Sequence, residues 1–153
     1  MPSKEVLELL RKGKAYAART KFKDALLYYN KALALEPGYP ESLVLRSSAY
    51  IDTGKYNEAL VDCDRALSVN QNYADAWSKK ALVLFYLDRF EDAIVASTRA
   101  TSLNGNDVSG WYIKGVCLDE MGRSDEAQEA YGRSLELEII LDIQAESKKI
   151  QRK

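Results

Sequence analysis

The stretch DAIVASTRA, residues 92–100, recurs along the chain and decides the fold. Its counterparts are DALLYYNKA at 24–32, EALVDCDRA at 58–66 and EAQEAYGRS at 126–134, and each begins 34 residues after the one before. In every copy an acidic residue precedes an alanine, and a basic residue stands near the end. A fixed period of this length predicts an array of repeated structural units that stack in a row.

The residues upstream of each copy show the same period. A small residue recurs at Gly13, Ser47, Ala81 and Gly115, and bulky residues flank it at helical spacing. Four units follow from these columns: 6–39, 40–73, 74–107 and 108–141. Each unit reads as a helix, a short turn and a second helix. We expect the two helices to approach closely at the small residue, with the alanine column of the second helix facing it.

These columns resemble those of the tetratricopeptide repeat family. That family repeats every 34 residues with the pattern Trp-x2-Leu-Gly-x2-Tyr, then Ala-x3-Phe, then Pro. Trp111, Lys114-Gly115 and the pair Ala25 and Tyr29 fit this pattern, although the position before the small residue is basic instead of Leu. The resemblance covers residues 6–141 and implies an all-α, right-handed α-solenoid. We therefore expect a single domain, 1–153, with a C-terminal helical segment at 142–153.

Two columns of basic residues run through the repeats. For the column before the small residue, we expect packed side-chain stems with the charged heads in water. For the column near the end of the second helix, we expect a favourable interaction with the helix dipole. The two columns are Lys12, Arg46, Lys80 and Lys114, and Lys31, Arg65, Arg99 and Arg133.

Composition argues against several classes of function. The chain has a net charge of −1, so nucleic acid and anionic membranes are not expected partners. There is no histidine, and the two cysteines, Cys63 and Cys117, are far apart in the sequence. We find no arrangement typical of catalysis, metal binding or cofactor binding. The expectation is a cytoplasmic, non-catalytic protein without a cofactor.

A repeat array of this kind offers a concave surface lined by the first helix of each unit. The run Leu82–Leu87 in the third unit is apolar on every side of its predicted helix, which indicates burial or a waiting partner. We predict that Phe85, Tyr86 and Tyr112 anchor a peptide or helix of a partner protein there. The alternative is that curvature or the C-terminal segment covers this patch. The full predicted partner-binding set is Leu82, Phe85, Tyr86, Tyr112, Ile113, Val116, Lys79, Lys14, Val44 and Ser48.

Some proteins of this family grip chaperone tails that end in Glu-Glu-Val-Asp by means of a carboxylate clamp of Lys, Asn and Arg side chains. The resemblance places Leu10, Lys14, Leu45, Asp75 and Lys79 at the clamp positions. A frame shifted by one unit gives Val44, Ser48, Lys79, Ser109 and Ile113. Neither set forms a clamp, so the resemblance implies the fold but not that ligand.

The end of the chain allows two arrangements. One is a break near Glu138, followed by a separate helix that folds back and caps the fourth unit. The other is one continuous helix from Ser124 to about Gln151, which leaves the edge of the array free for a second molecule. The first is favoured because terminal repeats usually carry a cap. The second suits the alternative function, a self-assembling unit that forms a homodimer or docks through its C-terminal edge.

Overall fold

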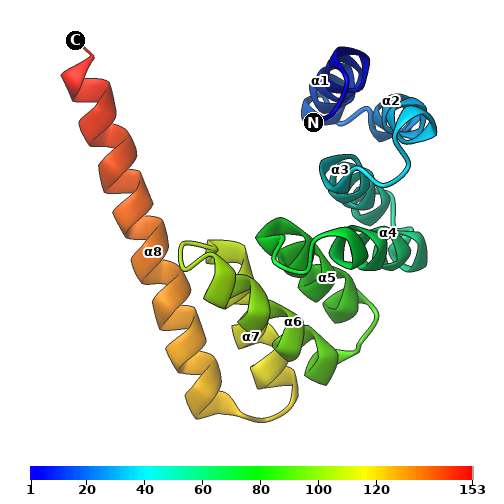
Figure 1. Ribbon diagram of the computed structural model, residues 1–153. Helices are drawn as coiled ribbons and strands as arrows, with labels where there is room; N and C mark the ends of the chain where they lie inside the picture. Colours follow the sequence, from blue (N-terminus) through cyan, green and yellow to red (C-terminus); the bar gives the residue numbers. More distant parts are fainter. Residues whose placement is uncertain (153) are drawn as a thin grey trace.

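The computed structural model describes residues 1–152, and this range contains eight α-helices and no strand. The helices are α1 (Lys4–Ala18), α2 (Phe22–Leu35), α3 (Pro40–Asp52), α4 (Tyr56–Val69), α5 (Ala74–Tyr86), α6 (Phe90–Leu103), α7 (Val108–Glu120) and α8 (Ser124–Gln151). They form four pairs that stack into a curved solenoid (Figure 1). The predicted all-α architecture is confirmed. Among the described helices, none combines enough length with enough apolar character to cross a membrane.

The turns within the four pairs share one backbone feature. The second residue of each turn has a positive φ: 57° at Thr20, 75° at Gly54, 56° at Asp88 and 72° at Gly122. These residues are 34 positions apart, so the same left-handed turn is built four times. Glycine adopts this conformation without steric cost, whereas a residue with a β-carbon does not. The turn geometry is therefore set by the repeat, and only two of the four units use the residue best suited to it.

The small residue of each unit is a close-packing point, as predicted, but its neighbour is different from the one expected. A β-carbon added to Gly115 would lie 2.7 Å from ring carbons of Tyr131, and one added to Gly13 would collide with the ring of Tyr29. In the second unit Ser47 occupies the small position, and its hydroxyl lies 3.4 Å from the Cys63 sulfur. The facing residue is thus the one four positions after the column alanine. Glycine meets tyrosine, and serine meets cysteine.

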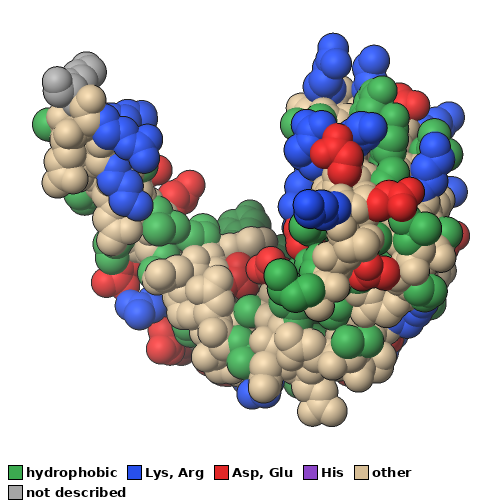
Figure 2. Space-filling view, turned by 45° about the horizontal axis from the view of Figure 1, so that its top comes forward, with side chains coloured by type: hydrophobic (Ala, Val, Ile, Leu, Met, Phe, Trp, Pro, Cys, Tyr) green, Lys and Arg blue, Asp and Glu red, His purple; other side chains and the backbone are tan. Residues whose placement is uncertain are grey.

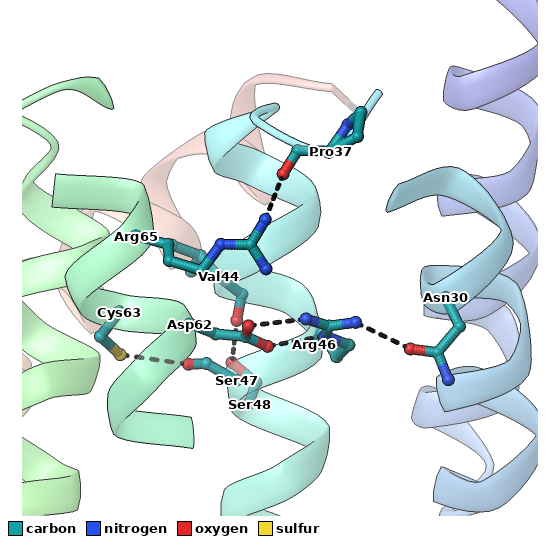
Figure 3. A network of polar contacts seen from close by, with 9 residues as sticks. All are labelled: Asn30, Pro37, Val44, Arg46, Ser47, Ser48, Asp62, Cys63 and Arg65. Atoms are coloured by element: carbon teal, nitrogen blue, oxygen red, sulfur yellow. Dashed lines mark hydrogen bonds and ion pairs between the residues drawn. The ribbon is translucent and has the colours of Figure 1, made fainter. Parts of the chain in front are cut away.

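The basic column before the small residue links neighbouring units, and the expectation of heads in water is wrong for Arg46. Its guanidinium donates two hydrogen bonds of 2.7 Å to the carboxylate of Asp62 and one of 2.9 Å to Asn30 in the preceding unit (Figure 3). Only 2% of the Asp62 side chain is exposed. At the same repeat position one unit later, Lys80 pairs with Asp64 at 2.7 Å. Because a buried carboxylate needs partners, Arg46 is part of the core.

The second basic column also bridges units. Arg65 donates to the carbonyl of Pro37 at 3.0 Å (Figure 3). Arg99 of the third unit donates to the side chain of Asn72 at 2.9 Å, in the equivalent loop at the end of the second unit. These two arginines hold the loops between units against the second helices, which is a specific contact beyond the expected helix-dipole effect.

α8 is one continuous helix, so the favoured prediction of a break near Glu138 and a separate cap is wrong. It runs from Ser124 to Gln151 without interruption and packs against α7 through Ala127, Ala130, Ser134 and Leu137. Every residue from 138 to 152 is exposed. Gly132 is the helix's single weak residue, and nothing near Glu138 disrupts the backbone hydrogen bonds. The second half of α8 therefore extends beyond the body of the solenoid (Figure 1). Lys153, the last residue of the predicted segment 142–153, lies outside the described residues.

Candidate functional site

The inner side of the curve is the candidate site. α1 and α3 lie on this side, and α2 and α4 lie on the outside (Figure 1). A space-filling view shows a deep hollow between the N-terminal units and α8, with acidic and hydrophobic side chains together on its floor (Figure 2). Concave surfaces of this kind in repeat proteins can receive an extended peptide or a helix.

An aromatic group joins the end of α5 to the start of α4 and α6. Tyr86 is exposed and stacks on Tyr56 of the preceding unit, with ring centroids 4.8 Å apart and planes inclined by 11°. Phe85 is half-buried and touches Tyr86 at a centroid distance of 5.5 Å and Phe90 at 6.2 Å. Leu82, one turn earlier, is half-buried as well. We name Tyr56, Leu82, Phe85 and Tyr86 the aromatic patch.

The structure does not bring every predicted residue to this patch. Ile113 and Val44 are each only 6% exposed, so they belong to the core. Val116 is half-buried. Tyr112 is exposed, but its aromatic neighbour is Tyr131 of α8, at 5.8 Å. Tyr112 therefore lies toward the C-terminal end of the array and not with the aromatic patch.

Polar contacts occupy other predicted residues. The hydroxyl of Ser48 donates to the carbonyl of Val44 at 3.1 Å, as a serine inside a helix often does. Lys14 is bound at 2.6 Å to the carboxylate of Glu41, which also accepts from the hydroxyl of Tyr39 at 3.0 Å. The hydrogen bond from Lys14 is the main reason that the pKa of Glu41 lies below its ordinary value. Lys14 is therefore already paired with a carboxylate of the protein itself.

Three further carboxylates belong to the first helices α3, α5 and α7. Asp52, Asp75 and Glu120 are exposed, and none of them takes part in an ion pair within residues 1–152. Burial, together with the nearby charges of Asp75 and Glu41, raises the pKa of Tyr73 to about 12. The predicted cation Lys79 is half-buried on α5. Acidic side chains thus lie on the floor of the hollow, and Lys and Arg side chains lie along its two walls (Figure 2).

Sequence reasoning missed Tyr56 and the pairing of Lys14 with Glu41. Tyr56 opens α4, where Phe22 and Phe90 open α2 and α6, so a column of aromatic residues at the first position of the second helix was visible. The Lys14 contact joins residues 27 positions apart, on the first helices of neighbouring units. Helical spacing within one unit does not reveal a contact of that kind.

Comparison with known proteins agrees with this architecture. A family model described as anaphase-promoting complex, cyclosome, subunit 3, which is of the tetratricopeptide repeat type, matches residues 18–96 and 52–134. The chain belongs to this tetratricopeptide repeat family. Such repeats are typically non-catalytic modules of protein interaction. No curated protein matches the sequence of this chain.

Several solved tetratricopeptide repeat structures are similar to this chain. The crystal structure of MamA is 26% identical, with a TM-score of 0.78, and the match covers 90% of this chain and 80% of that one. The first repeat domain of Spaghetti (RPAP3), bound to the HSP90 peptide SRMEEVD, is 26% identical with a TM-score of 0.76, over 80% of this chain and 97% of that one. The Sgt2 domain from Aspergillus fumigatus is 25% identical with a TM-score of 0.77, over 81% and 83%.

Within residues 1–152, the floor of the hollow carries acidic side chains where an acidic peptide would need basic ones (Figure 2). Of the five residues at the expected clamp positions, Leu10 is buried and Lys14 is neutralised by Glu41. Asp75 adds a negative charge at a third position. An acidic ligand would meet unpaired carboxylates in this hollow, and like charges in close contact are unfavourable.

Proposed function

We propose that this tetratricopeptide repeat chain is a non-catalytic scaffold that holds a peptide or an amphipathic helix of a partner protein in its concave groove. The partner segment carries an apolar side chain that packs on the aromatic patch, with Lys or Arg beside it. The observation that carries this proposal is exposed Tyr86, which stacks on half-buried Tyr56 and touches half-buried Phe85. Exposed aromatic clusters of this kind are typical of interaction sites.

Charge supports the chemistry of the partner segment. Asp52, Asp75 and Glu120 carry no ion-pair partner among the described residues, so they can bind basic side chains at little cost in broken contacts. Lys14 does not offset them, because Glu41 already binds it. Electrostatic complementarity chiefly sets specificity and association rate, and it should favour basic over acidic peptides.

Selection from a library of displayed random peptides tests this proposal. We expect enrichment of peptides that combine an aromatic or leucine residue with Lys or Arg. Binding of an enriched peptide should weaken about 30-fold in Tyr86→Ala, because truncation of an anchor costs about 2 kcal/mol. Val95→Ala is the matched control, since Val95 is an exposed apolar residue on the outer helix α6. Circular dichroism checks that both variants remain folded.

A second variant tests the charge argument. Lys14→Ala leaves Glu41 without its ion-pair partner and adds a free carboxylate to the groove. Binding of the enriched basic peptide should become several-fold tighter at low salt, and the gain should shrink at high salt because exposed charges are screened. Enrichment of acidic peptides, or equal binding by wild type and Tyr86→Ala, would show that the aromatic patch is not the site.

A further inference from the structure

The last unit leaves open a face that every earlier unit closes. Leu135 on α8 is 58% exposed, whereas its equivalents Leu33, Leu67 and Thr101 are 6%, 7% and 7% exposed. Tyr112 on α7 is 55% exposed, whereas at the equivalent position Leu10 and Val44 are buried and Ser78 is half-buried. In units one to three the following unit covers these positions. We name Tyr112, Tyr131, Leu135, Ile139 and Ile143 the terminal face.

This face continues along the free part of α8. Leu135, Ile139 and Ile143 are each four residues apart, so they lie on one side of the helix, and all three are exposed. This side is opposite the residues Ala130, Ser134 and Leu137, which pack against α7. Glu146, whose carboxylate is bound to Lys149 at 2.7 Å, interrupts this side of the helix before exposed Ile150. The apolar surface is therefore centred on Ile139.

At the N-terminal end of the solenoid, a charged pair lies where the later units have a buried residue. In α3, α5 and α7 the third position of the unit is buried, as Ser42, Ala76 and Gly110. The equivalent residue in α1 is Glu8, which is exposed and accepts two hydrogen bonds from Arg11, at 2.6 and 2.9 Å. If α1 of another copy covered the terminal face, this charged pair would be buried. Head-to-tail stacking of copies is disfavoured for that reason.

The charges of α8 favour a second α8 in the opposite direction. Residues 124–138 carry five acidic residues and one basic residue, and residues 140–152 carry two acidic and three basic residues. An antiparallel pair places each acidic half beside a more basic half, whereas a parallel pair places the two acidic halves together. Opposite charges beside an apolar seam set the orientation of paired helices.

We propose that the terminal face binds the same face of a second copy of this chain. The two α8 helices run antiparallel, with Ile139 near the two-fold axis and Leu135 of each copy against Ile143 of the other. A surface that is complementary to itself in this way forms a closed dimer. This site lies apart from the aromatic patch, so the dimer does not depend on the proposed peptide binding.

Sedimentation equilibrium of the full chain tests the dimer. One chain has a mass of 17.2 kDa, and we expect a reversible dimer over about three decades of concentration. Ile139→Lys should raise the dissociation constant of the dimer by about 30-fold or more, because it places two like charges at the axis. Val95→Lys, on the outer helix α6, should leave the dimer unchanged. A wild-type chain that stays monomeric, or a dimer indifferent to Ile139→Lys, would overturn the proposal.

Disulfide formation tests the orientation. Leu135→Cys and Ile143→Cys, each alone, should give little cross-linked dimer under mild oxidation, and an equal mixture of the two should give it readily. A parallel pair would give the reverse, with each single variant linking to itself. The native thiols of Cys63 and Cys117 are buried, so they do not compete. Efficient self-linking of the single variants would reject the antiparallel arrangement.

Discussion

Gly115 lies directly beneath the ring of Tyr131, and a β-carbon at this glycine would come within 2.7 Å of two ring carbons. The ring cannot withdraw without losing its contact with Tyr112 and its 3.2 Å hydrogen bond to Asp119. The first and second helices of the fourth unit are thus held at a distance that only glycine permits.

Gly115→Leu should lower the free energy of unfolding by about 1–3 kcal/mol or more, because overpacking a close helix contact forces the helices apart. Gly132→Ala is the matched control on the same helix pair, since a β-carbon at Gly132 meets no atom within 4 Å. That change should stabilise the protein by about 0.5–1 kcal/mol through helix propensity. Urea denaturation measures both, and a neutral Gly115→Leu would show that this contact is not tight.

Arg46 and Lys80 occupy the same repeat position but should differ in their effect on stability. Arg46→Met leaves the carboxylate of Asp62 buried with its principal partner removed, which should cost about 3 kcal/mol. Lys80→Met removes a pair whose acidic side chain, Asp64, is 54% exposed, and should cost less than about 1 kcal/mol. Thermal unfolding of the two variants side by side gives the comparison. Equal losses would mean that the burial of Asp62 does not matter.

Thr20 holds a left-handed backbone conformation that its β-branched side chain disfavours. Thr20→Gly should relieve about 1–2 kcal/mol of steric cost, less about 0.5–1 kcal/mol for the greater freedom of glycine in the unfolded chain. A net gain in stability is therefore expected. The reciprocal change, Gly54→Thr, should lower stability at the equivalent turn. If Thr20→Gly is destabilising, the turn tolerates threonine for a reason other than backbone geometry.

The two cysteine thiols should react very slowly with thiol reagents while the protein is folded. Burial raises the pKa of the Cys63 thiol and that of the Cys117 thiol to about 11. Reaction with a disulfide reagent at about pH 8 should therefore require opening of the structure, since the thiolate is the reactive form. Adding denaturant should expose both thiols together. Rapid reaction of either thiol in the native protein would contradict this prediction.

The same raised pKa values have a consequence for stability at alkaline pH. The unfolded thiols ionise near their ordinary pKa of about 8.5, whereas the folded ones stay protonated up to about pH 11. Their contribution is therefore present below about pH 8.5 and is lost as the pH rises toward 11. Cys63→Ala should flatten the fall in stability over this range.

The residues that recur every 34 positions predicted much of the architecture, because the same packing requirement applies at that position in each of the four units. Gly13 and Gly115 were correctly identified as points of close approach, and the four helix pairs follow from the same period. The buried pair of Arg46 and Asp62 was missed, although an acid stands where the other units have Tyr28, Ala96 and Ala130. The acidic residue at a repeat position that is otherwise uncharged was the sequence feature that could have revealed this pair.

The C-terminal helix and the groove were harder to predict for a different reason. The absence of a helix breaker around Glu138 pointed to a continuous helix, but the expectation of a terminal cap outweighed it. Tyr112 and Phe85 both lie on first helices, in neighbouring units. A unit is covered on its C-terminal side only where another unit follows it, and no unit follows the one that contains Tyr112. Which residues are exposed thus depends on where the array stops, and no single unit carries that information.

The glycine–tyrosine pair of the first unit and the serine–cysteine pair of the second also limit how the chain can misfold. Four similar units could slip by one repeat, so that a first helix pairs with the second helix of its neighbour. A slip that placed Ser47 beneath Tyr29 would produce a clash, and one that placed Gly13 beneath Cys63 would leave a void. The first helices of units one and two therefore recognise their own second helices by size, which fixes the register at this end of the array.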